Sequence, residues 1–181
     1  MRRSTITALV LTSVAGATLG GLPAAAAPPT TRVVQDAHEP RSAYDIETVT
    51  LTSAPAGHKR ATVVVEHDRR VRVGDGISVW INTDDDPAPD LFVTGYAFSE
   101  YTVHRSRSWT RHGKDISDRG CASLRMRGER AIVRFDPDCL EPATKFSVSV
   151  RSFVQGRPDR TADDAPRARQ FTHAVLAHST V

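Results

Sequence analysis

The sequence predicts an all-β protein, an antiparallel β-sandwich with jelly-roll or immunoglobulin-like layers. Short segments rich in β-branched residues alternate apolar and polar side chains with period two. Turn residues separate these segments about every ten positions, as in sandwich folds. No segment shows a helical period of adequate length. One domain of about 155 residues, large enough for a core, remains once the N-terminal segment is set aside.

Residues 1–26 are typical of a secretory signal peptide. Arg2 and Arg3 form a basic start, residues 6–22 are mostly small or apolar, and Ala24, Ala26 and the residue between them fit a cleavage site. The apolar stretch is too short for a membrane anchor, and no other segment is long enough to span a bilayer. We therefore expect a secreted, extracellular protein with a flexible lead at 27–42, a sandwich domain at 43–176 and a tail at 177–181.

The predicted strands follow the alternation along the chain. The segment 77–82 is the clearest central strand, because Ile77, Val79 and Ile81 alternate with more polar neighbours before an acidic loop. Segment 69–73 is expected to extend the strand 60–67 or to lead to the next strand, and 108–111 is a candidate for a short strand. Segment 170–176 is a closing strand or a loose tail, and 111–120 and 156–169 are polar loops. The remaining predicted strands are 44–53, 60–67, 91–98, 100–105, 121–127, 130–136 and 144–154.

Two cysteines, Cys121 and Cys139, predict a disulfide in an exported protein. A hairpin that turns at about residue 129 places position 121 roughly opposite position 138. The bridge should therefore clamp the open end of its own hairpin. A catalytic or metal-binding thiol pair is the alternative, but no histidine lies nearby at ligand spacing.

The charge composition does not favour nucleic acid as a partner. Two of the 24 Lys and Arg residues lie in the predicted signal peptide and all 21 acidic residues follow it, so the mature net charge is about +1. Nucleic-acid binding requires a clustered basic footprint, which this balance does not indicate. The chain is therefore expected to bind no nucleic acid.

Several segments taken together resemble a family. They are Asp36 with Tyr44-Asp45-Ile46, VWINTDDDPAP at 79–89, SEYTVHRSRSW at 99–109, Cys121 with Cys139-Leu140, FSVSVRSF at 146–153, and Ala165-Pro166. This order resembles a group of uncharacterised secreted actinobacterial proteins that look like β-sandwiches of the DOMON/CBM9-like superfamily. The resemblance implies binding of sugars or haem, or an accessory role. In the family pattern the third strand ends with Asp-Thr-Asp, whereas in this sequence Asn82 occupies the position of the first aspartate.

The acidic loop after the central strand is a candidate calcium site. Asn82, Asp84, Asp86 and Asp90 could supply several of the six to eight oxygen ligands that Ca²⁺ takes. The loop has neither the spacing nor the glycine of an EF-hand. The alternative is a solvated turn, since Asp and Pro are ordinary loop residues.

Four aromatic residues are candidates for a ligand-binding platform: Trp80, Trp109, Tyr96 and Tyr101. Trp80 lies on the opposite face of its strand from Val79 and Ile81, so it should not share their core. Exposed rings of this kind stack on sugar faces. The alternative is that Trp80 fills the second face of an inner strand or lies under the C-terminal segment.

No catalytic constellation is recognisable in the chain. The histidines are scattered, with no HExxH pair, and no serine lies in a GxSxG elbow. Met126 is interpreted as a core residue, which disfavours haem. We therefore expect no catalytic residues and a secreted, non-catalytic binding or structural module, associated with the cell wall or a carbohydrate. The alternatives are a calcium-stabilised protein-interaction domain and a hydrolase with an unrecognised site.

Overall fold

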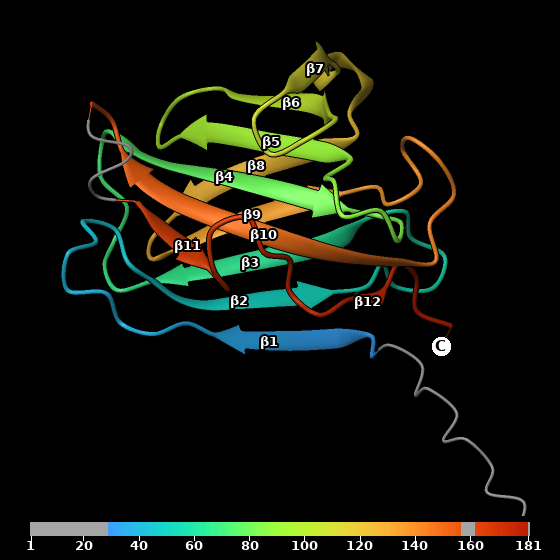
Figure 1. Ribbon diagram of the computed structural model, residues 1–181, viewed down its shortest axis with the longest axis horizontal. Helices are drawn as coiled ribbons and strands as arrows, with labels where there is room; N and C mark the ends of the chain where they lie inside the picture. The colour runs from blue at the N-terminus through green and yellow to red at the C-terminus, as the bar shows by residue number, and fades with distance from the viewer. Residues whose placement is uncertain (1–28, 157–161, 181) are drawn as a thin grey trace, which may run out of the picture.

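The computed structural model describes residues 29–156 and 162–180, and within them the chain is an antiparallel β-sandwich (Figure 1). The first sheet has the strand order β1-β2-β3-β9-β8, and the second has β11-β10-β4-β5-β6-β7, with β12 paired to β10. The strands are β1 Thr31–Gln35, β2 Ile46–Thr52, β3 Ala61–His67, β4 Asp75–Asn82, β5 Leu91–Tyr96, β6 Tyr101–Ser106, β7 His112–Asp115, β8 Ala122–Arg127, β9 Arg130–Phe135, β10 Lys145–Val154, β11 Asp163–Ala165 and β12 Val175–Leu176. The predicted fold class is confirmed.

The core lies between the two sheets. Alternate residues of the central strands point inward, so that Val63 and Val65 of β3 and Val79 and Ile81 of β4 are fully buried in one core. The rings of Phe135 and Phe146 meet edge to face in the same core, with centroids 5.0 Å apart. Burial of this apolar surface is the main term that holds the two sheets together.

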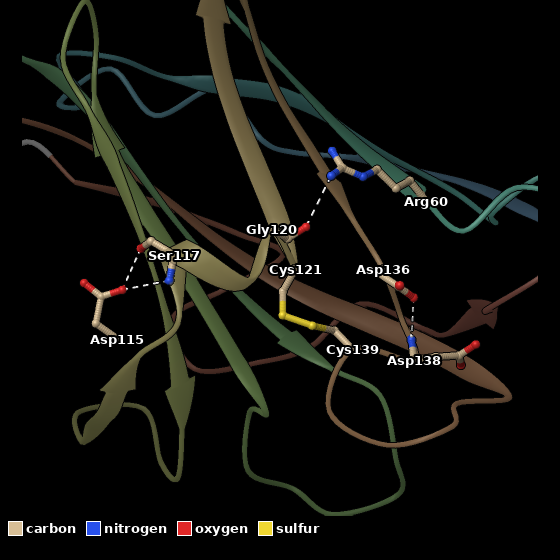
Figure 2. Close-up of a disulfide and its surroundings, with 8 residues drawn as sticks. All are labelled: Arg60, Asp115, Ser117, Gly120, Cys121, Asp136, Asp138 and Cys139. Atoms are coloured by element: carbon tan, nitrogen blue, oxygen red, sulfur yellow. Dashed lines mark hydrogen bonds between the residues drawn. A yellow bond between two sulfur atoms is a disulfide. The ribbon is translucent and has the colours of Figure 1, made fainter.

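The disulfide joins Cys121 to Cys139 and closes the open end of the β8–β9 hairpin, as the sequence predicts (Figure 2). The two Cα atoms lie 5.5 Å apart. Beside the bridge, Asp136 accepts a hydrogen bond from the backbone N–H of Asp138 at 3.0 Å, which shapes the turn that carries Cys139. In the chain-entropy model a loop of this length stabilises the fold by about 3 kcal/mol.

Three short strands lie where the sequence predicts none. β1 falls inside the expected flexible lead and pairs along its whole length with β2, so that prediction is wrong for 31–35. β7 replaces the strand expected at 108–111, which forms bends instead, and β11 lies inside the predicted loop 156–169. The 69–73 segment is not a strand either, and β5 ends at Tyr96 rather than at 98.

The C-terminal residues are part of the fold. Ala177 is fully buried, and its carbonyl accepts a hydrogen bond from the N–H of Ala54. The N–H of Ser179 donates to the carbonyl of Ala54. The folded region thus extends beyond the predicted domain limit at 176. The predicted signal peptide, 1–26, lies outside the described residues, and in the described part no helix is long and apolar enough to cross a membrane.

Candidate functional site

A hollow of about 190 Å³ opens where the β5–β6 hairpin meets the edge strand β8. The residues that line it are a mixture of aromatic, aliphatic and polar side chains: Tyr96, Phe98, Ser99, Tyr101, Leu124, Arg125 and Met126. The hairpin and β8 approach closely at Gly95, where an added Cβ would lie 2.9 Å from the Cβ of Tyr101 and 3.0 Å from Cδ2 of Leu124. Glycine at this position therefore allows the two sheets to meet at the rim of the hollow.

Phe98 is the most exposed aromatic residue of this hollow. Its side chain is 75% exposed, and its backbone has φ of 61°, in the left-handed region that residues other than glycine seldom adopt. The turn that imposes this conformation is closed by a hydrogen bond from the N–H of Ser99 to the carbonyl of Tyr96. The fold thus holds a large apolar ring in water on a strained backbone, a combination that is common at binding sites.

Tyr96 stands beside Phe98 and is braced from behind. Its ring is 40% exposed and meets the ring of Phe153 edge to face, with centroids 5.5 Å apart and planes at 89°. Phe153 can lie there because its cross-strand neighbour is Gly76, where a Cβ would come within 2.4 Å of the Phe153 ring. The brace fixes the orientation of the Tyr96 ring before any ligand arrives.

The four aromatic residues predicted as a platform do not form one group. Tyr96 and Tyr101 line the hollow, whereas Trp80 and Trp109 lie together on the outer face of the second sheet, with ring centroids 6.0 Å apart. Trp80 also packs on Phe92, and Trp109 packs on Phe171. Both indoles are half-buried. As expected, Trp80 does not share the core of Val79, but it is covered by other rings rather than presented as a free surface.

The predicted acidic loop is closed by its own hydrogen bonds. The amide of Asn82 donates to the carbonyls of Asp86 and Ala88, and its oxygen accepts from the N–H of Asp84 at 3.1 Å. Asp84 and Asp86 each accept from a backbone N–H two residues further on. These are Asx turns, in which the side chains shape the loop.

Asp90 closes the same loop from its far end. Its Oδ2 accepts from the N–H of Thr83 at 2.7 Å and from the Thr83 hydroxyl at 2.9 Å. Burial raises the pKa of Asp90, and the carboxylates of Asp84 and Asp86 add to that effect, while the bonds from Thr83 oppose it. Among the described residues, no group of three or more His, Cys, Asp or Glu side chains is placed to hold a metal ion. The calcium site remains a prediction.

A buried polar cluster, not predicted from the sequence, lies where β2, β3 and β11 meet. The ring of His67 stacks on that of Tyr44, and the guanidinium of Arg69 lies 4.7 Å from the centroid of the same Tyr44 ring. Arg69 also forms two hydrogen bonds with the buried carboxylate of Asp75, at 2.7 and 2.8 Å. Burial lowers the pKa of His67 to about 4, so the imidazole is neutral near pH 7.

Asp163 is the carboxylate of this cluster that joins the two sheets. Its Oδ2 accepts from the N–H of Ile46 at 2.6 Å, a contact between β11 and β2. The pKa of Asp163 is raised to about 7, mainly by burial and also by the nearby carboxylates of Asp36, Glu39 and Asp45, while the bond from Ile46 opposes the rise. Asp163 is 1% exposed. A contact across 117 residues leaves no local pattern, so the sequence could not have indicated it.

Comparison with known protein families and with curated proteins finds no match for this chain.

Proposed function

We propose that the chain is a secreted, non-catalytic module that binds an extracellular polysaccharide through the hollow at Tyr96, Phe98 and Tyr101. The observation that carries the proposal is the exposure of Phe98 on a left-handed backbone beside the braced ring of Tyr96. An apolar ring held in water in this way gains free energy when a ligand covers it.

The chemistry of the hollow suits a sugar. A pyranose ring has an apolar face of C–H groups that stacks on an aromatic ring, and hydroxyl groups at its edge that need hydrogen-bond partners. Ser99 supplies a hydroxyl, and Arg125 supplies a fork of N–H donors at the side of the hollow. A few polar groups around an apolar surface is the usual composition of a small-molecule binding site.

The test compares Phe98→Gly with Val33→Ala. Glycine removes the ring and tolerates the left-handed backbone, so this variant should fold at least as stably as the parent protein. Val33 is also exposed, at 55%, but it lies on β1 at the opposite edge of the first sheet. The readout is depletion of the protein from solution by insoluble cellulose, chitin, xylan and purified cell wall.

We expect at least one of these materials to bind the parent protein and Val33→Ala equally, and to bind Phe98→Gly about tenfold more weakly, the equivalent of about 1.4 kcal/mol. Equal binding by Phe98→Gly and the parent protein would show that the hollow is not the binding site. Binding of none of the four materials would contradict a polysaccharide ligand of these classes, and a protein ligand is the alternative occupant.

A further inference from the structure

The outer side of the β8–β9 hairpin carries a row of arginines. In both strands the inward residues are apolar, so alternation turns the arginines to the outside. Arg125 and Arg127 of β8 share this side with Arg130 and Arg134 of β9. Lys59 and Arg60, just before β3, extend it beside Arg134. We call these six residues the arginine face.

The positive charge of this face is only partly neutralised. Arg127 and Arg130 are direct cross-strand partners, an arrangement of like charges that costs stability. Glu66 on β3 pairs with Arg130 at 2.7 Å. Arg60 donates instead to neutral groups. One is the carbonyl of Gly120 at 3.2 Å (Figure 2), and the other is the hydroxyl of Ser123 at 3.4 Å. An excess of exposed positive charge therefore remains.

The arginine side chains border two adjoining hollows. One, of about 220 Å³, is lined by Arg125, Arg127, Arg130, Ile132 and Arg134. The other, of about 340 Å³, is lined by Lys59, Arg60, Thr62 and Arg134 among others. Arg134 borders both, so together they form a continuous basic track across β8, β9 and β3.

The spacing of the cations suits a linear polyanion. Side chains two residues apart on a strand are about 7 Å apart, and neighbouring strands are about 5 Å apart. Guanidinium groups bind carboxylates through two parallel hydrogen bonds, which a lysine cannot form. A polymer with one carboxylate per repeat could therefore meet several of these arginines in succession.

The rest of the sheet surface favours a polysaccharide over a nucleic acid. Beside the arginines, the outward side of β2 and β3 carries hydroxyl groups, from Thr48, Thr50 and Thr62, that can bond to sugar hydroxyls. No aromatic residue lies on the outward side of β1, β2, β3, β9 or β8, whereas proteins that bind single-stranded nucleic acid usually combine a basic groove with rings on which bases stack.

We propose that the arginine face binds an acidic polysaccharide that carries carboxylate groups. This surface is distinct from the aromatic hollow and shares with it only Arg125. It therefore adds a preference for charge to a module whose hollow recognises the sugar ring. The contacts are largely electrostatic, so added salt weakens them.

The test uses soluble polygalacturonate, its fully methyl-esterified form and single-stranded DNA as probes. Arg127→Gln/Arg134→Gln removes two charges from the arginine face and leaves Arg125, which the hollow shares, in place. Arg41→Gln/Arg111→Gln removes two exposed charges away from β3, β8 and β9 and is the matched control. All four positions are exposed, so the melting temperatures of both variants should stay near that of the parent protein.

We expect polygalacturonate to bind the parent protein and the control, and to bind Arg127→Gln/Arg134→Gln about tenfold more weakly. The methyl ester should bind weakly to all three. Equal affinity of the two double variants for polygalacturonate would overturn the proposal, as would DNA binding as tight as that of polygalacturonate. Phe98→Gly separates the two surfaces. If this variant binds polygalacturonate as tightly as the parent protein does, the proposed role of the hollow is contradicted, while the proposed role of the arginine face is still supported.

Discussion

The imidazole of His67 lies face to face with the ring of Tyr44, with centroids 3.7 Å apart and planes inclined by 4°. His67 is 2% exposed, and neither ring nitrogen has a hydrogen-bond partner among the described residues. The stack therefore buries a neutral imidazole, and protonation of that ring would place an unpaired charge in the interior.

We predict that His67→Phe makes the protein more resistant to mild acid. The pKa of His67 is lowered to about 4 by burial, with a further contribution from Arg69. As the pH falls from 6.5 to 4, the unfolded chain binds a proton that the folded chain does not, so stability is lost. Phenylalanine keeps the stack and cannot titrate.

Urea unfolding of both proteins at pH 7.5, 6.0 and 5.0 measures this difference. The stability of His67→Phe relative to the parent protein should rise as the pH falls, by at most about 1.4 kcal/mol per pH unit. A difference that stays constant across the three pH values would show that His67 titrates normally in the folded protein.

Asp163 should give the opposite pH dependence. Burial raises its pKa to about 7, with help from the nearby carboxylates of Asp36, Glu39 and Asp45. Between pH 4 and pH 7 the folded chain holds a proton that the unfolded chain has released, so stability falls as the pH rises. Asp163→Asn keeps an oxygen for the N–H of Ile46 and removes the titration.

The stability of Asp163→Asn relative to the parent protein should therefore increase from pH 4.5 to pH 7 and then level off. The size of the effect is a few kcal/mol at most, since each pKa unit corresponds to about 1.4 kcal/mol. Thermal melting of both proteins at four pH values measures this difference in stability. A variant that loses stability to the same extent at every pH would show that Asp163 is ionised throughout.

The central strands and the edge strand β8 could be predicted from the sequence, whereas the edge strands β1, β7 and β11 could not. Strands such as β4 and β10 are buried between neighbours and carry the alternation that marks a half-buried strand. β7, His112–Asp115, is exposed at every position, and β11 has three residues. These strands form by backbone pairing to a sheet that already exists, so their side chains carry little signal.

Only part of the candidate site could be predicted from the sequence, because the rest depends on contacts that form in the folded chain. Tyr96 and Tyr101 could be identified as aromatic residues near a turn, but the exposure of Phe98 depends on the left-handed turn that carries it. Trp80 was correctly placed on the outer face. Trp80 is covered by Trp109, which itself packs on Phe171. These residues come from distant parts of the chain and meet only in the folded protein.

We predict that Trp80 stabilises the fold and takes no part in binding. The segment that carries Phe171 is fastened to β10 by Thr172, whose N–H donates to the carbonyl of Val148 at 2.8 Å. Trp80→Ala would remove one of the two rings that pack on Trp109 and open a gap in this ring cluster, at a cost of about 2 kcal/mol. Trp80→Phe, which retains a ring, should cost less.

Chemical unfolding measures the loss, and polysaccharide depletion under native conditions measures binding. Trp80→Ala should bind as the parent protein does, whereas Phe98→Gly should bind weakly and unfold normally. Weak binding by Trp80→Ala with unchanged stability would move the site from the hollow to the outer face of the second sheet.

The last prediction concerns Asn82, which is 4% exposed. Its amide donates to two carbonyls, those of Asp86 and Ala88. Asn82→Asp would turn a carboxylate toward both oxygens with no proton to share, so we expect a loss of about 2–3 kcal/mol, more than in Asn82→Ala. Thermal melting with a chelator and with added calcium tests this.

If calcium restores the stability of Asn82→Asp, the result would support the predicted metal site, because the ion would replace the lost donor with its own positive charge. Unchanged stability of Asn82→Asp in chelator would contradict the role of the Asn82 amide in closing the loop.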